Sequence, residues 1–211
     1  MTNASHRARR SGDLDALEQR DFDIVVIGGG ITGAGIARDA ALRGLSVALL
    51  EASDFASGTS SRSSRLIHGG LRYLEHGHLG LVLESSRERR VLLRVAPHLV
   101  RPLAFTWPVY SGARVAGWQL GAGLALYDVL AGFQNVRNHR LLTLTDVTEI
   151  EPALARDGLR GGARYFDAAT DDSRLTLANA LGAVAAGGVI LNHVAARDLV
   201  MEGGVVRGVV A

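Results

Sequence analysis

The segment from Asp23 to Glu51 constrains the fold more than any other part of this 211-residue chain. It begins with a short apolar run, Ile24 to Ile27, that is typical of a β-strand. Gly28, Gly30 and Gly33 follow with G-x-G-x-x-G spacing, and a helical run then leads into a second apolar run. A strand, a glycine turn and a helix in this order present backbone N–H groups and the positive end of a helix dipole to phosphate groups. The segment therefore predicts a βαβ unit that binds a dinucleotide.

Each residue of this unit has an expected physical role. Gly28 permits the tight turn, and the missing Cβ of Gly30 lets a pyrophosphate approach the backbone. Gly33 and Ala37 are small enough for the helix to pack closely on the strands. Glu51 ends the second strand, where its carboxylate can accept hydrogen bonds from ribose hydroxyls. A turn that served packing alone would leave Glu51 unexplained. The segment does not separate FAD from NAD, because both place an ADP half on such a unit.

Composition narrows the class of protein. Hydrophobic residues make up 47% of the chain, enough for a sizeable core in a globular protein. Cysteine is absent, which excludes disulfides, thiolate metal sites and cysteine nucleophiles. Every basic residue is arginine or histidine, and the formal net charge is only +2. The arginines alternate with acids along the chain, so we expect a solvated surface and no nucleic-acid partner. The histidines show no metal-binding pattern with nearby carboxylates, and no metal site is predicted.

The rest of the chain is predicted to form helices and strands around two loop-rich stretches, 52–74 and 134–163. The expected helices are 13–19 within a polar tail of residues 1–20, then 76–95, 115–130 and 174–186, with another beginning near 146–149. The expected strands are 103–110, 162–166 and 189–191, followed by a hairpin of 199–201 and 205–210. The chain stops at Ala211 inside an apolar run, so we expect it to be the front portion of a longer polypeptide.

Two adjacent carboxylates, Asp171 and Asp172, precede the helix expected at 174–186. Paired carboxylates are one pattern for acid/base catalysis. The same residues also supply the side-chain oxygens that helix N-termini prefer. We interpret them as a helix cap.

The longest apolar stretch, 115–133, is interrupted by Gln119 and Asp128 and is rich in glycine. It falls short of a membrane-spanning helix. A buried helix and a helix at a membrane surface both remain open for it. Residues 1–20 contain HRARR but no apolar core of a secretory signal.

A serine-rich loop follows the βαβ unit. Hydroxyl residues crowd into positions 59–64, with Arg62 and Arg65 among them. Hydroxyls, backbone amides and cations in one place suit contacts to a phosphate or a polar cofactor. On composition alone a solvated linker is an equal interpretation. The run that follows, LIHGGLRY, mixes apolar residues, paired glycines, an imidazole, a guanidinium and a phenol, which is not typical of a linker.

This loop and the run after it carry a resemblance to a known family. The sequence SGTSSRSSRLIHGGLRYLEHG strongly resembles that of the FAD-dependent glycerol-3-phosphate dehydrogenases. The resemblance continues in ERRVLL (88–93), APHL (96–99), LALYD (124–128), YFD (165–167) and DDSRL (171–175), and so covers about residues 21–200. The HGGLRYL run after a serine-rich loop is far more specific than the glycine fingerprint.

The resemblance implies FAD as the cofactor and a defined fold. The fold class is α/β, a Rossmann-like FAD-binding domain of the glutathione-reductase/D-amino-acid-oxidase type, incomplete at the C-terminus. Residues 21–211 would be a truncated oxidoreductase domain, with 21–75 and 165–211 as its FAD-binding part. Residues 76–164 would be an insertion and the start of the substrate-facing part. The implied reaction oxidises sn-glycerol 3-phosphate to dihydroxyacetone phosphate, with hydride passing from C2 to flavin N5.

The resemblance also assigns site residues by position. Arg72 and Tyr73 would face the substrate, and a guanidinium matches a phosphate in a bidentate way. Without the resemblance they read as a surface arginine and a packing residue, and His68 is equally well a structural histidine. No catalytic residue is assignable within this chain. The implied FAD contacts are Gly28, Gly29, Gly30, Ile31, Thr32, Gly33, Glu51, Ala52, Thr59, Ser60, Ser61, Ser64, Leu66, His68, Gly69, Gly70 and Ala196.

Two other functions remain open at this point. One is another FAD-dependent amino-acid or hydroxy-acid oxidase of the same fold, whose substrate would lack a phosphate. The other is a non-catalytic nucleotide-binding remnant. The family needs further FAD and phosphate-binding residues after Ala211, so we expect the 211-residue chain by itself to be inactive.

The resemblance implies partners as well. The electron acceptor is a membrane quinone in the dehydrogenases and oxygen in the related oxidases. A cytoplasmic location, with peripheral attachment to the inner face of the cell membrane, follows from the same analogy. A homodimer remains one option for the assembly.

Overall fold

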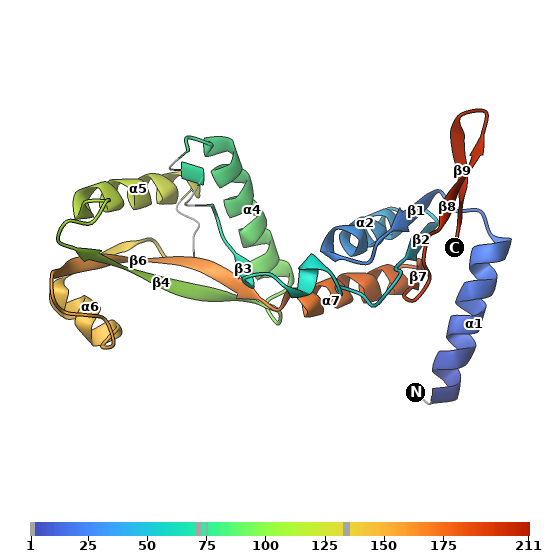
Figure 1. Ribbon diagram of the computed structural model, residues 1–211, viewed down its shortest axis with the longest axis horizontal. Coiled ribbons are helices and arrows are strands. Elements are labelled where there is room, and N and C mark those ends of the chain that lie inside the picture. The colour runs from blue at the N-terminus through green and yellow to red at the C-terminus, as the bar shows by residue number, and fades with distance from the viewer. Residues whose placement is uncertain (1–2, 71–72, 75, 133–135) are drawn as a thin grey trace. The chain divides into compact units, whose positions relative to one another are not determined.

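A computed structural model describes residues 3–70, 73–74, 76–132 and 136–211 (Figure 1). The chain divides into two compact units. The first unit comprises residues 1–64 and 171–211, and the second unit comprises residues 65–170. The arrangement within each unit follows from the periodicity of its own sequence.

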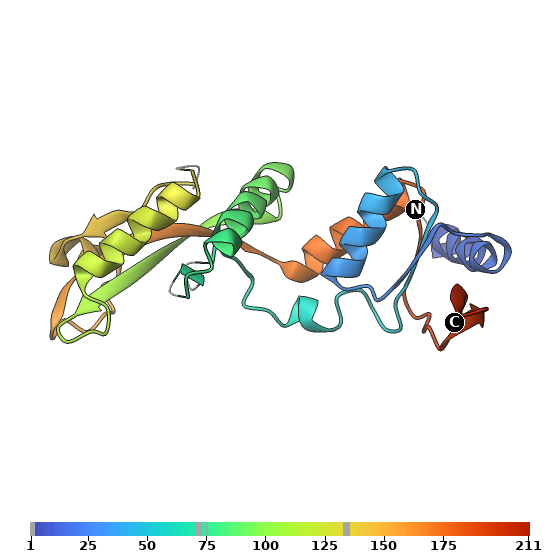
Figure 2. The ribbon, with the colours of Figure 1, turned by 90° about the horizontal axis from the view of Figure 1, so that it is seen from above.

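The first unit is built on a parallel sheet with the strand order β1-β2-β7. These strands are β1 (Ile24–Ile27), β2 (Val47–Leu50) and β7 (Val189–Leu191). Helices α2 (Ile31–Leu42) and α7 (Asp172–Ala185) lie side by side in both views (Figures 1 and 2). All four residues of the central strand β2 are buried, as expected for a parallel strand covered on both sides. The predicted βαβ unit is confirmed.

Alanine accounts for the close packing of α2 on the strands. Its buried face consists of Ala34, Ala37, Ala40 and Ala41. These small side chains contact Val26, Val47 and Leu49 of the sheet in one hydrophobic cluster. Ala37, predicted to permit this packing, is fully buried.

The N-terminal helix is longer than its sequence suggests. Helix α1 spans Asn3–Gln19, whereas the prediction was a polar tail with a helix at 13–19 only. The guanidinium of Arg10 donates hydrogen bonds to Oδ1 and to the carbonyl oxygen of Asn192, at 3.1 and 2.8 Å. These contacts join α1 to the segment after β7, a tertiary interaction that no local pattern reveals.

The end of the first unit agrees with the predictions. Strands β8 (Asp198–Glu202) and β9 (Val205–Val210) form an antiparallel hairpin around two glycines with positive φ. At the start of α7, Oδ1 of Asp171 accepts a hydrogen bond from the backbone N–H of Arg174 at 3.1 Å. Asp172 accepts a hydrogen bond from Oγ of Ser63 at 2.6 Å. The interpretation of Asp171 as a helix cap is therefore confirmed.

The second unit is built on an antiparallel sheet with the order β3-β6-β4, in which β5 also pairs with β6. Its strands are β3 (Leu66–Ile67), β4 (Val100–Tyr110), β5 (Arg140–Leu142) and β6 (Leu159–Thr170). The predictions for β4 and β6 were too short, and β3 and β5 lie in stretches predicted to be loops. Pro102 falls inside β4, and proline is tolerated there because β4 pairs with β6 on one edge only within the described residues.

Helices cover both faces of this sheet. In Figure 1, α5 (Gly117–Leu130) and α6 (Leu144–Ile150) lie on opposite sides of β4 and β6, with α4 (Leu79–Val95) beside α5. Leu120 and Leu124 of α5 pack against Ala163 of the sheet. The predicted helices near 76–95, 115–130 and 146–149 are confirmed with shifted ends. Helix α6 begins two residues early because Thr143 caps it, accepting a hydrogen bond from the N–H of Asp146.

Of the predicted apolar run 115–133, the described residues 115–132 are neither all buried nor all exposed. One face of α5 lies in the core. Trp118, Leu126 and Val129 of the same helix are exposed, and Trp118 is 74% exposed. Within the described residues, no helix combines the length and the hydropathy that crossing a membrane requires.

Candidate functional site

The turn between β1 and α2 is closed so tightly that two of its positions require glycine. Gly28 has φ of +106°, in the region that favours glycine, and its N–H donates to the carbonyl oxygen of Leu50 at 2.8 Å. A Cβ atom on Gly33 would collide with the carbonyl oxygen of Gly28. The first turn of α2 therefore lies directly against the end of β1, as the glycine spacing predicts.

Glu51 joins this turn to the neighbouring strand ends. Its Oε2 accepts a hydrogen bond from the N–H of Gly29 at 2.6 Å, and its Oε1 accepts one from the N–H of Ser53 at 2.7 Å. The backbone of Glu51 bonds to Leu191 and Val194, at the end of β7. A Cβ atom on Gly29 would lie 2.9 Å from Cβ of Glu51. The carboxylate thus faces the glycine turn at the carboxyl ends of three parallel strands.

A serine hydroxyl lies at the N-terminus of α2. Oγ of Ser60, from the short helix η1 (Thr59–Ser61), accepts a hydrogen bond from the N–H of Ile31 at 3.0 Å. The N-cap residue Gly30 has no side chain to cap the helix, and a Cβ atom there would lie 3.3 Å from the same Oγ. The hydroxyl of Ser60 therefore accepts a hydrogen bond at the N-terminus of α2, where the N-cap residue has no side chain.

The N–H donors at the glycine turn and at the start of α2 have the chemistry that suits the pyrophosphate of a dinucleotide. Unpaired N–H groups at a helix N-terminus bind phosphate oxygens, and the helix dipole favours their negative charge. Gly28 and Gly30 are partly exposed, so the backbone of the turn is accessible there. The carboxylate of Glu51 retains lone pairs for ribose hydroxyls. The first unit brings together predicted residues from three segments, 28–33, 51–52 and 59–61. Ala196 follows β7 on the segment whose Val194 bonds to Glu51, and Ser64 is exposed after η1.

The other predicted residues lie in the second unit. Leu66 belongs to β3 and pairs with Ala169, and Gly69 and Gly70 beyond it are buried. His68 is exposed, Tyr73 is 38% exposed, and their ring centroids are 6.5 Å apart. Arg72 lies outside the described residues.

A buried polar cluster lies beside these residues, and the sequence patterns do not indicate it. Arg89, Tyr127 and Asp167 are each at most 3% exposed, and Arg89 and Asp167 form an ion pair. Burial raises the pKa of the Tyr127 phenol well above its usual range, with a further contribution from the charge of Asp167. Each residue falls in a run that carries the family resemblance, but nothing in the sequence indicates that the three runs meet.

Burial also keeps a second phenol of this unit protonated. Tyr165 stacks on Phe105, with ring centroids 5.2 Å apart. Burial, and then the negative charge of Asp167, raise the pKa of Tyr165 to about 12. This phenol is therefore neutral throughout the physiological pH range.

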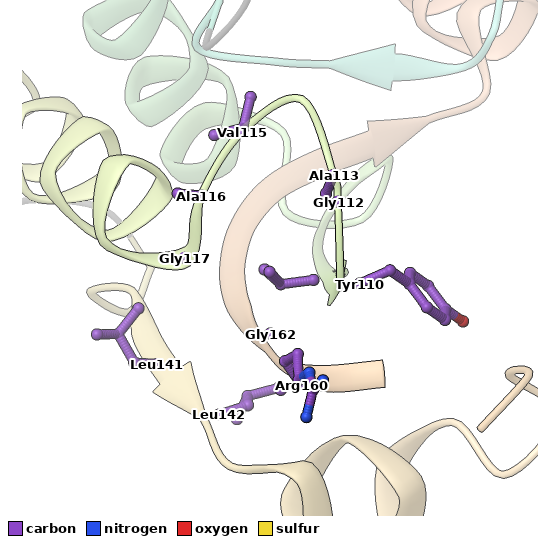
Figure 3. A pocket seen from close by; sticks show the side chains of 12 residues that line it. Tyr110, Gly112, Ala113, Val115, Ala116, Gly117, Leu141, Leu142, Arg160 and Gly162 are labelled. Atoms are coloured by element: carbon purple, nitrogen blue, oxygen red, sulfur yellow. The ribbon is translucent and has the colours of Figure 1, made fainter. Parts of the chain in front are cut away.

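Open pockets are also present in the second unit. Figure 3 shows one of about 440 Å³ at the start of α5. Its lining is mostly apolar or glycine, and its one cation, Arg160, donates through Nε to Oγ of Ser111 at 2.6 Å. A second pocket, of about 830 Å³, is lined by Trp107, Tyr165 and Arg114 among others. Neither lining contains a residue predicted from the sequence to bind FAD or substrate.

The chain is similar in sequence to two named enzymes and in structure to a third protein. It is 50% identical over 184 residues to a glycerol-3-phosphate dehydrogenase of Synechocystis sp., covering 87% of this chain and 33% of the relative. It is 41% identical over 199 residues to an alpha-glycerophosphate oxidase of Streptococcus pyogenes, covering 93% of this chain and 32% of the relative. The crystal structure of the glycerol-3-phosphate dehydrogenase from Bacillus halodurans complexed with FAD superposes with a TM-score of 0.72 at 33% identity, covering 95% of this chain and 32% of that one.

The chain spans about one third of the length of these relatives. The family model of the FAD dependent oxidoreductases matches residues 23–211, which is nearly all of the sequence. The match begins at the strand that precedes the glycine turn and includes every candidate residue of both units. The chain therefore belongs to the FAD dependent oxidoreductase family.

Proposed function

We propose that this protein oxidises sn-glycerol 3-phosphate to dihydroxyacetone phosphate with FAD. The observation that carries the proposal is the cradle of Gly28–Gly33, Glu51 and Ser60. It lies in a chain that is 50% identical over 184 residues to a relative named glycerol-3-phosphate dehydrogenase. Bound FAD would supply the acceptor for the hydride that leaves C2 of the substrate. The residues of this chain bind and orient the cofactor and the substrate phosphate.

In this proposal the first unit holds the ADP half of the cofactor. The N–H groups at the start of α2, including those of Ile31 and Thr32, would bind the pyrophosphate together with the hydroxyls of Thr59, Ser60, Ser61 and Ser64. Glu51 would accept hydrogen bonds from the ribose while it keeps its bonds to Gly29 and Ser53. Ala52 and Ala196 would contact the adenine side. Leu66, His68, Gly69 and Gly70 would contact the flavin, and Arg72 and Tyr73 the substrate.

Substitution of Glu51 by glutamine should weaken FAD binding about tenfold or more. The carboxylate accepts from two backbone N–H groups, and a glutamine amide would direct its NH₂ donor at one of them. A lost hydrogen bond to a charged group costs about 1.5–3 kcal/mol. Fluorescence titration of the flavin-free protein with FAD measures the change. Glu202→Gln on the exposed hairpin β8–β9 is the matched control, and equal affinities for the two variants would contradict the role of Glu51.

Substitution of Arg72 by alanine tests whether this residue binds the phosphate of the substrate. A guanidinium holds a phosphate through two charge-assisted hydrogen bonds, so their loss should lower kcat/KM for glycerol 3-phosphate about a hundredfold. The flavin content of the purified protein should not change. Arg94→Ala, at an exposed position of α4, controls for the loss of one positive charge.

A comparison of substrates with and without a phosphate separates the candidate enzymes. Turnover of glycerol 3-phosphate, but not of amino acids or unphosphorylated hydroxy acids, supports the proposal. An active flavoprotein that prefers the unphosphorylated compounds would make it another oxidase of the same fold. A protein from the complete reading frame that retains no flavin would contradict the enzymatic function altogether.

The electron acceptor, the location and the assembly belong to the same proposal. The named relatives include both a dehydrogenase and an oxidase, so quinone and oxygen are both acceptors to test, by quinone reduction and by hydrogen peroxide release. Peripheral attachment to the inner face of the cell membrane is supported by the exposed apolar residues Trp118, Leu126 and Val129 of α5, and sedimentation with anionic lipid vesicles tests it. Light scattering tests the homodimer.

A further inference from the structure

Three hydrogen-bond donors converge on one carboxylate oxygen in the interior of the second unit. Oδ1 of Asp167 accepts from the N–H of Gly69 at 2.9 Å, from the hydroxyl of Tyr127 at 2.9 Å and from Nη1 of Arg89. Arg89 also donates to the phenol oxygen of Tyr127 at 2.6 Å. The three side chains come from β6, α5 and α4, so they connect the sheet to two of the helices that pack on it.

The donor from Gly69 lies where strand pairing stops. Strand β3 pairs with β6 through Leu66 and Ile67, opposite Ala169 and Ala168. Beyond Ile67 the backbone leaves the ladder, and the N–H of Gly69 bonds to the side chain of Asp167. The carboxylate therefore accepts from a backbone N–H group just beyond the last paired residue of β3.

The absence of a side chain at Gly69 is part of the same arrangement. A Cβ atom there would collide with the phenol oxygen of Tyr127 and lie 2.8 Å from both Nη1 of Arg89 and Oγ of Ser86. The backbone of Gly69 thus lies directly on the buried cluster. The next residue, Gly70, has φ of +76°, and its carbonyl oxygen accepts from the N–H of Tyr73 at 2.7 Å.

The same short segment presents two rings to solvent. His68 is exposed, Tyr73 is partly exposed, and both flank the two buried glycines. The backbone of Gly69 is therefore held by buried polar contacts, whereas the side chains of His68 and Tyr73 remain accessible to solvent. A buried ion pair is a poor source of net stability, because desolvation of the charges offsets their attraction. Directional hydrogen bonds to a backbone N–H do, however, define one geometry.

We propose that Asp167, Tyr127 and Arg89 are positioning residues that fix the backbone of the 68–70 segment and so set the placement of His68 and Tyr73 toward the flavin and the substrate. The identity of those two ligands rests on the proposed function, whereas the fixing of the segment does not. None of the three residues is proposed to touch a ligand. They act through Gly69, and Tyr127 remains a neutral donor to the carboxylate.

Tyr127→Phe is the most direct test, because it removes one hydroxyl and leaves the charges of Arg89 and Asp167 paired. Ser86→Ala is the matched control, since the Ser86 hydroxyl is buried beside Gly69 and has no hydrogen-bond partner among the described residues. In the flavin-free protein from the complete reading frame, hydrogen exchange of the peptide covering 66–74 should be at least about tenfold faster in Tyr127→Phe than in Ser86→Ala. Equal exchange in the two variants would overturn the proposal.

A second measurement uses the flavin-loaded protein. Reduction of the flavin by glycerol 3-phosphate should slow at least about tenfold in Tyr127→Phe, because displacement of reacting groups is costly in rate. Reduction by dithionite, which needs no positioned substrate, should not change, and Ser86→Ala should match the wild type in both. A variant that lost only thermal stability, with both reduction rates unchanged, would make the cluster purely structural and overturn the proposal.

The two proposals fail in distinguishable ways. If the wild type does not turn over glycerol 3-phosphate, the proposed function fails, while the exchange experiment still decides whether the cluster fixes the segment. If Tyr127→Phe does not fold, the wild type supplies the test. The Gly69 amide lies outside the strand ladder and should nevertheless exchange as slowly as the amides of β6. Exchange at the rate of an exposed loop would overturn the proposal without any variant.

Discussion

Gly33→Ala is expected to abolish flavin retention and to lower the free energy of unfolding by about 3 kcal/mol or more. The added Cβ would collide with the carbonyl oxygen of Gly28, and its other near neighbours are the carbonyl carbon of Gly28 and a side-chain methyl of Val26. Backbone cannot rotate away as a flexible side chain can, so α2 must move off β1. That movement also displaces the N–H groups at the start of the helix. Chemical denaturation and the ratio of flavin to protein absorbance measure the two effects.

The same helix provides the control. Gly35 lies two residues further along α2, and a Cβ atom there would meet nothing within 4 Å. Gly35→Ala should therefore stabilise the protein by about 0.5–1 kcal/mol, because alanine loses less conformational entropy than glycine in a helix. Flavin content should not change. If the two variants were equally stable, the tight contact between Gly33 and Gly28 would not exist in solution.

Asp167→Asn is expected to lower the free energy of unfolding by about 3–5 kcal/mol. The substitution keeps the shape of the side chain but removes the charge that balances the buried guanidinium of Arg89. Breaking a buried pair by neutralising one partner leaves an uncompensated charge in a region of low dielectric constant. Urea denaturation of the variant and the wild type at the same pH measures the difference.

An exposed ion pair in the same protein tests whether the loss of stability depends on burial of the charges. Asp39 of α2 and Arg43, the C-cap residue of that helix, form an ion pair of 2.7 Å, with side chains 65% and 71% exposed. Asp39→Asn should change stability by no more than the error of the measurement, because water screens exposed pairs. The double variant Arg89→Met with Asp167→Asn should be more stable than Asp167→Asn alone, since the unpaired charge is gone. A double variant less stable than the single one would contradict this account.

Much of the first unit could be predicted from the sequence because its determinants are local. The glycine spacing, the strands on either side of it and Glu51 all lie within 29 consecutive residues, and each has its role through neighbours in that segment. The cap at Asp171 and the hairpin around two glycines are local in the same sense. Such features can be recognised in the sequence. A backbone conformation that only glycine tolerates requires a glycine, and a helix cap requires a side chain that bonds to a nearby N–H group.

In the second unit, sequence patterns do not reveal the pairing between strands that are far apart in the chain. Strand β6 extends well beyond the predicted 162–166 because β4, β5 and β3 all pair with it, and a strand is stabilised by its partners more than by its own residues. β3 is only two residues long and was predicted to be loop. Its pairing with Ala168 and Ala169 crosses about a hundred residues of sequence, which no periodicity records.

The sequence by itself determined the βαβ unit, the family resemblance and the residues that we propose to hold FAD. The tertiary structure alone decided that Arg89, Tyr127 and Asp167 meet beneath Gly69. An arginine in a charged helical run and an aspartate in a strand each read as surface residues, because sequence shows charge but not burial. Only the packing of α4 and α5 on β6 removes them from water. Once they are buried, each must find a partner, and the backbone N–H of Gly69 is one of them.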